Sequence, residues 1–211
     1  MNKEAKKFEI PSCDQLKAGI DAFVRKEDRG KLYFIALSHI RENWEYFSEM
    51  ASGIKLLLDS WHRNFYRFGT FDLNLLSECI AQNFQSVVHF NNRTLFSLSN
   101  QDEDEIQRLF NHFLDALRVR KSRSPVAVSK ALHLLAPDFY PLWDNNIALA
   151  YDTLWGDSAF GVFRYIDFCW KTKDIITTVA KCECMHNPSP KRSLLKLIDE
   201  YNYSKFTKRW I

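Results

Sequence analysis

Glycine and proline are scarce in this sequence of 211 residues, which has six of each, so long irregular loops are not expected. No run of about eighteen apolar residues is present, so no transmembrane helix is expected. The N-terminal stretch MNKEAKKFEIPS has basic residues without an apolar core behind them, which is unlike a secretory signal peptide.

Cysteine is also limited. Five cysteines, an odd number, indicate a reducing compartment rather than a disulfide framework, and a cytoplasmic location is predicted. Cys182 and Cys184, followed by His186, suggest a metal site, but a closed tetrahedral site needs a fourth ligand and none is evident. An ordinary loop is therefore preferred there. A Gly-rich phosphate loop and a His-Glu zinc pair are missing as well, so neither a metal nor a cofactor is predicted.

The apolar residues that are present follow helical spacing. Residues 102–118 have them at i, i+3, i+4 and i+7, and the acidic run Asp102 to Glu105 suits the N-terminus of such a helix. Similar stripes recur in 40–51, 73–87 and 194–201, and the seventeen phenylalanines fall mainly on them, as expected of core residues. TLFSLS (94–99) is predicted as a connector. We predict an all-α fold of about eight to ten helices, in a single domain 1–211 or two packed lobes.

Residues 118–151 contain the most informative pattern. Ser124 and Pro125 predict a helix start, with Lys130 and His133 inside the helix, and Asp144 is placed to cap the next one. No acidic residue occurs from 118 to 137, whereas five cations do: Arg118, Arg120, Lys121, Arg123 and Lys130. A basic loop before a helix N-terminus is a natural phosphate site, and a solvated surface loop is the alternative. The net charge of +3 permits a nucleic-acid partner without requiring one.

The stretch SPVAVSKALHLLAPDFYPLWDNNIA resembles the core of the helix-hairpin-helix DNA glycosylase superfamily. In that family a Pro-Gly-Val-Gly hairpin leads to a lysine near a helix start, and an aspartate caps the following helix. The fold that the resemblance implies is all-α and two-lobed. Val126 and Val128 stand where the hairpin glycines are expected, and the interval from Lys130 to Asp144 is several residues shorter than in familiar members. The four-cysteine cluster of the iron–sulfur branch is missing.

The resemblance implies roles for individual residues. Lys130 would be the nucleophile that forms a Schiff base with the sugar, and Asp144 would stabilise the positive charge that develops there. The amine must be neutral to attack, which burial and a helix N-terminus would favour. His133, Tyr140 and Trp143 would form the pocket for an extruded base. Contacts to the DNA backbone would come from Arg118, Arg120, Lys121, Arg123, Ser124 and Ser129.

Three functions are therefore considered. The first is a monomeric DNA N-glycosylase with abasic-site lyase activity, acting on duplex DNA with a modified base and associated with the nucleoid. The second is a nucleic-acid-binding module of the same fold without chemistry. The third is a helical protein-interaction domain, which predicts no connected basic surface around residues 118–130.

Overall fold

The computed structural model describes residues 9–27, 30–67, 69–157, 160–186 and 192–211. The regular secondary structure in these ranges is helical. They form twelve α-helices: α1 (Cys13–Lys26), α2 (Gly30–Glu42), α3 (Phe47–Trp61), α4 (Arg63–Tyr66), α5 (Leu73–Gln82), α6 (Phe84–Asn91), α7 (Glu103–Ala116), α8 (Pro125–Leu135), α9 (Asn145–Ala150), α10 (Gly161–Val179), α11 (Glu183–His186) and α12 (Leu194–Asn202). Short 3₁₀ helices cover Leu95–Ser97 and Asn100–Asp102, and a π-helical turn covers Tyr203–Thr207.

The prediction of an all-α fold is confirmed, and the number of helices is higher than expected. The excess comes from α4 and α11, which have four residues each and are too short to produce a periodic pattern. Within the described ranges, the only β-type pairing is an isolated bridge between Val119 and Ser122. None of the helices in these ranges is both long and apolar enough to cross a lipid bilayer.

Two predicted helix starts are confirmed by their caps. Ser124 Oγ accepts a hydrogen bond from Ala127 N at 3.3 Å, and Pro125 is the first residue of α8. Asp144 Oδ1 accepts from Ile147 N at 2.8 Å at the start of α9. Each cap satisfies a backbone amide that lacks an intrahelical partner, which is worth about 1 kcal/mol.

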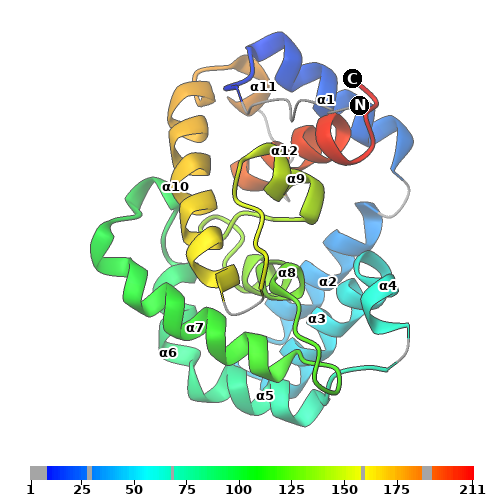
Figure 1. Ribbon diagram of the computed structural model, residues 1–211, viewed down its shortest axis with the longest axis vertical. Helices are drawn as coiled ribbons and strands as arrows, with labels where there is room; N and C mark the ends of the chain where they lie inside the picture. The colour runs from blue at the N-terminus through cyan, green and yellow to red at the C-terminus, as the bar shows by residue number, and fades with distance from the viewer. Residues whose placement is uncertain (1–8, 28–29, 68, 158–159, 187–191) are drawn as a thin grey trace.

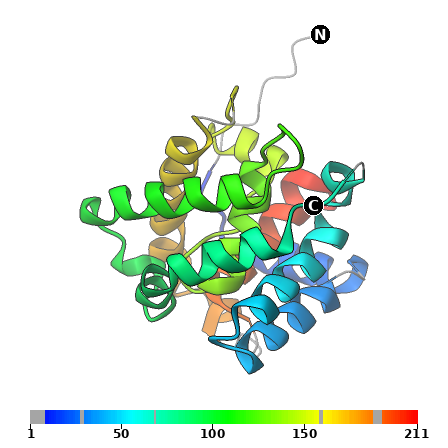
Figure 2. The same ribbon diagram turned by 90° about the horizontal axis from the view of Figure 1, so that it is seen from below.

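The helices gather in two groups around one continuous hydrophobic core (Figure 1). One group contains α2 to α8, in which α2 and α3 lie side by side (Figure 2) and α7 packs on α8. The other contains α1, α9, α11 and α12. The long helix α10 runs beside both groups and contacts α7, α8 and α12.

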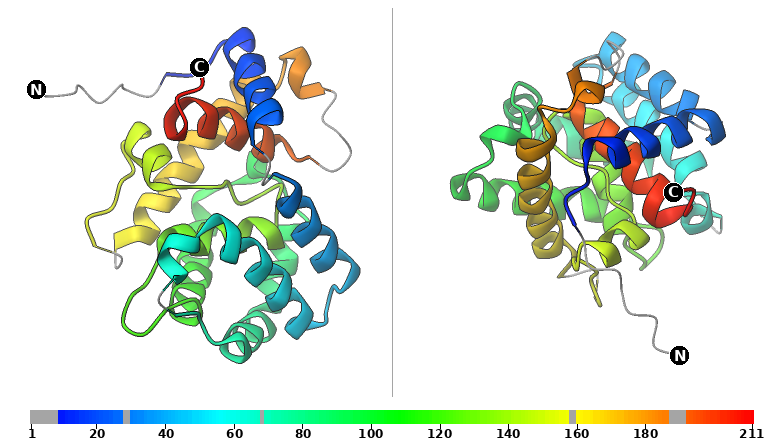
Figure 3. Two further views of the ribbon diagram at one scale, coloured as in Figure 1. Left: turned by 90° about the vertical axis from the view of Figure 1, so that its right-hand side faces the viewer. Right: turned by 90° about the horizontal axis from the view of Figure 1, so that it is seen from above.

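The helix at the start of the chain packs against the one near its end, since α1 lies along α12 (Figure 3). Gly19 permits the close approach, because a Cβ at this position would lie only 2.7 Å from Tyr201 Cδ2. Ser204 Oγ also donates to Gly19 O at 2.8 Å, and Tyr203 Oη donates to Glu27 Oε2 at 2.9 Å. These contacts bring residues that are far apart in sequence into one layer.

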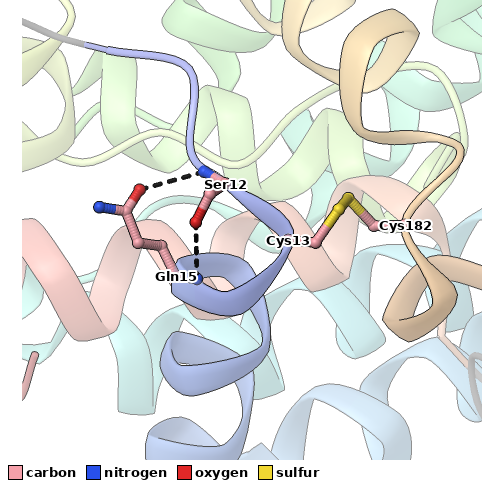
Figure 4. The surroundings of a disulfide bond; sticks show 4 residues. All are labelled: Ser12, Cys13, Gln15 and Cys182. Atoms are coloured by element: carbon pink, nitrogen blue, oxygen red, sulfur yellow. Dashed lines mark hydrogen bonds between the residues drawn. A yellow bond between two sulfur atoms is a disulfide. The ribbon is translucent and has the colours of Figure 1, made fainter.

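A disulfide between Cys13 and Cys182 links α1 to the turn before α11 (Figure 4). Next to it, Ser12 and Gln15 form a capping box that starts α1. The sequence-based expectation of a chain without disulfides is wrong at this pair, because the fold brings two cysteines 169 positions apart to a Cα–Cα distance of 5.4 Å. Cys182 is thereby removed as a metal ligand, while Cys79, Cys169 and Cys184 are free thiols.

Candidate functional site

Lys130 projects from α8 to the end of α3. Its side chain is buried, with the residue 8% exposed, and Nζ donates a hydrogen bond to the Trp61 carbonyl at 2.7 Å. Trp61 is the last residue of α3, so this carbonyl belongs to the negative end of a helix. The expected burial is present, and the amine is hydrogen-bonded to the end of α3.

Asp144 is held through both carboxylate oxygens. Oδ1 caps α9, and Oδ2 accepts a hydrogen bond from Thr207 Oγ1 at 2.7 Å. Lys130 and Asp144 are therefore each tied to a different part of the structure, one to α3 and the other to α9 and the C-terminal turn. Reaction at a common sugar would require at least one of these contacts to change.

Ser129 joins α8 to the backbone just before Asp144. It is fully buried, and its hydroxyl lies within hydrogen-bond distance of the carbonyls of Val126 (3.0 Å) and Trp143 (3.2 Å). A side chain in this position does not reach a DNA phosphate, in contrast to the sequence-based expectation. Its observed role is to pack the two segments together.

The residues expected to form a base pocket lie in the core. His133 is fully buried, with Nδ1 2.7 Å from Tyr140 O and Nε2 2.9 Å from Tyr33 Oη, so both ring nitrogens have partners. Burial lowers the pKa of His133 to about 3, so its ring is neutral at ordinary pH. Trp143 Nε1 donates to Thr153 Oγ1 at 3.2 Å.

Tyr140 has a buried hydroxyl with no hydrogen-bond partner among the described residues. None of His133, Tyr140 and Trp143 is among the described residues that line two cavities of this protein, one beside Trp61 and the other beside Trp44. Their arrangement is that of packed core side chains, and an extruded base could not reach them without movement of their neighbours.

The basic loop before α8 is exposed, as expected. Arg118, Arg120, Lys121 and Arg123 all lie at the surface, around a tight turn closed by the backbone bridge between Val119 and Ser122. Arg120 occupies the turn with φ +55°. Arg123 Nε donates to Asp115 Oδ1 at 2.8 Å, and this pair is exposed.

A second segment, which the sequence did not connect to this loop, lies against it. His62 Nε2 is 2.7 Å from Ser124 Oγ, and Tyr66 Oη donates to Leu117 O at 3.2 Å. Burial, and to a smaller extent the charge of Lys130, lowers the pKa of His62 to about 3. Since the imidazole is neutral at ordinary pH, the hydroxyl of Ser124 can donate to it while accepting from the amide of Ala127.

This segment adds two exposed arginines to those of the loop. We call the combined surface the basic face, and it consists of Arg63, Arg67, Arg118, Arg120, Lys121 and Arg123. Asp115 forms an ion pair with Arg123, which belongs to the face, and Asp59 forms one with Lys55, which lies outside it. The pair with Asp115 offsets one of the six cations, so the face as defined keeps a positive excess.

A cavity of about 650 Å³ opens beside the basic face. Its described lining residues come from α2, α3, α4 and the single residue between α3 and α4: Leu32, Leu56, Asp59, Ser60, Trp61, His62, Arg63 and Asn64. Trp61 and His62 connect it to the Lys130 amine and to Ser124, respectively. Neither Lys130 nor Asp144 is among these lining residues.

On the other side of α8, the first turn of α10 packs against Pro125. A Cβ on Gly161 would lie 2.6 Å from Pro125 Cγ, so only glycine allows this contact. Phe160 and Phe163 project to solvent from this turn, 62% and 52% exposed. Two large exposed rings thus lie near the start of α8.

No group of three or more His, Cys, Asp or Glu side chains in the described ranges is arranged to hold a metal ion. Comparison of the chain with protein-family models, with curated proteins and with solved structures finds no match in any of the three.

Proposed function

We propose that this protein binds DNA through the basic face. The observation that carries the proposal is the convergence of two basic segments, 63–67 and 118–123, beside the N-terminus of α8. Arginine and lysine neutralise phosphates, and the N-terminus of a helix carries a partial positive charge that adds to them. A protein-interaction domain has no need for such a surface, so the basic face supports nucleic-acid binding over that function.

The salt dependence of binding tests this proposal. Each phosphate contact contributes about −0.9 to the slope of log K against log salt concentration for duplex DNA. A double variant, Arg120→Glu with Lys121→Glu, is expected to weaken binding and to reduce the slope by about 2. The matched control reverses Arg25 and Lys26, which are exposed at the end of α1 in the other helix group. Equal binding by both double variants would contradict the use of the basic face.

Base excision is a second candidate function, and the specific observation that favours it is a buried lysine whose hydrogen-bond partner lines a cavity. At about 650 Å³ the cavity falls within the usual range for small-molecule sites. In this proposal Asp144 stabilises the positive charge that develops on the sugar as the base leaves, and Lys130 attacks the anomeric carbon. Lys130 must first leave the Trp61 carbonyl and lose its proton.

Covalent trapping distinguishes excision from binding alone. Borohydride reduces a Schiff base to a stable bond, so it is expected to link the wild-type protein to one of a panel of duplexes that each contain a modified base, and Lys130→Ala is expected to abolish the link. Lys173→Ala is the control, because Lys173 Nζ also donates to a backbone carbonyl, that of Leu98, at 2.6 Å. Trapping that persists in Lys130→Ala would exclude Lys130 as the nucleophile. Salt-sensitive binding with no trapping would indicate the module without chemistry.

A further inference from the structure

Three cysteines belong to α1, to the turn before α11 and to α11, and α1 contacts α11. Cys13 is the first residue of α1 and forms the disulfide with Cys182 (Figure 4), while Cys184 is a free thiol two residues further along the chain. The remaining cysteines, Cys79 and Cys169, are buried in the core as free thiols. The disulfide therefore has a single partly exposed thiol as its neighbour in sequence.

Cys184 lies within electrostatic range of the side of α1 that carries Cys13. Cys13, Lys17 and Asp21 are spaced at i, i+4 and i+8, so they lie on one side of the helix. Lys17 and Asp21 both act electrostatically on the Cys184 thiol, and α11, which carries this thiol, contacts α1. Helix α11 is a single turn with only Met185 buried, so few contacts oppose a small shift of α11 along α1.

We propose that Cys13, Cys182 and Cys184 form a thiol–disulfide exchange unit in which Cys13 changes partner between Cys182 and Cys184. The Cys184 thiolate attacks Cys13 Sγ, the Cys13–Cys184 bond forms, and the Cys13–Cys182 bond breaks. Cys182 leaves as a thiolate and takes up the proton that Cys184 lost. The number of disulfides is unchanged, so no oxidant or reductant is consumed, and the attachment point of α1 moves by two residues.

The surroundings of Cys184 predict how the rate depends on pH. Partial burial raises the pKa of its thiol, Asp21 and Glu183 act in the same direction, and Lys17 opposes them. Little thiolate is present at neutral pH, so exchange is expected to be slow there and to accelerate as the pH rises. An external thiol of low molecular weight would intercept the same disulfide and leave a mixed disulfide on one of the three cysteines.

Serine variants test the exchange directly. Cys182→Ser is incubated with oxidised glutathione as the disulfide donor, free thiols are blocked, and an unreduced digest is analysed by mass spectrometry. The expected product is a peptide pair joined through Cys13 and Cys184. Cys184→Ser is expected to retain the Cys13–Cys182 pair, and Cys13→Ser should give neither pair.

In the unmodified protein, both the Cys13–Cys182 and the Cys13–Cys184 pairs are expected after incubation at high pH, with Cys79 and Cys169 unpaired throughout. Circular dichroism of each variant establishes that it is folded. A folded Cys182→Ser protein in which Cys13 pairs only with glutathione or with a second chain would overturn the proposal. So would a wild-type protein that keeps a single pairing at every pH.

Discussion

Replacing Cys13 by serine is expected to cost this protein a large part of its stability, because the disulfide closes most of the chain into a loop. With a sequence separation of 169, the chain-entropy relation gives a loss of about 17 cal/mol/K in the unfolded state. This corresponds to about 5 kcal/mol at 25 °C as an upper value, and removal of a native disulfide commonly costs about 2–5 kcal/mol. Typical domains have only about 5–15 kcal/mol in total.

Urea unfolding followed by circular dichroism measures the change in the free energy of unfolding. The control is Cys184→Ser, which removes a half-buried thiol without opening the loop and is expected to change stability far less than Cys13→Ser. The measurement is repeated on the wild-type protein with a reductant, which should reproduce the Cys13→Ser value. A Cys13→Ser loss below about 1 kcal/mol would refute the loop argument, since it would mean that residual structure already restrains the unfolded chain or that the bond does not form.

Two further predictions concern pH and packing. His62 and His133 have pKa values of about 3 in the folded protein and about 6.5 when unfolded. Above pH 6.5 both states hold these rings neutral, so stability is highest there; below pH 6.5 the unfolded chain binds protons that the folded protein does not, and stability falls. As the pH falls towards 3, each histidine is expected to remove at most about 1.4 kcal/mol per pH unit, and His133→Phe should reduce this slope in acid unfolding measurements. A slope unchanged in that variant would show that His133 is not held neutral. Gly19→Ala is expected to destabilise by about 1–3 kcal/mol because its Cβ meets Tyr201, whereas Gly156→Ala, with nothing within 4 Å, should be close to neutral in thermal unfolding. Equal melting temperatures would contradict the tight contact between α1 and α12.

The parts of the fold that the sequence predicted are those controlled by local interactions. The stripe of α7 is buried at Ile106, Leu109 and Phe113, and Glu103 lies in its first turn, as expected from spacing and charge. The connector at 94–99 contains only a 3₁₀ turn and irregular backbone. Each of these features depends on residues within about two helical turns of one another, and such patterns are visible in one dimension.

The candidate site was less predictable because its contacts join distant segments. Lys130 meets the carbonyl of Trp61, 69 residues earlier, and Ser124 meets His62, 62 residues earlier. No spacing rule links such residues. The half of the basic face that sequence analysis missed is the segment 63–67. Its signal is the pair Arg63 and Arg67, which are one helical turn apart. The sequence does not indicate which loop this pair lies beside.

The pairing of α1 with α12 has a consequence for biosynthesis. Of the described helices, α1 is synthesised before the others, yet α12, on which its apolar side packs, becomes available only when residues 194–202 have left the ribosome. Cys13 likewise cannot form its disulfide before Cys182 has been synthesised. During most of translation this amphipathic helix therefore lacks the helix on which its apolar side packs. A chain that stalls or is cut before residue 194 would leave the apolar side of α1 exposed to chaperones and proteases.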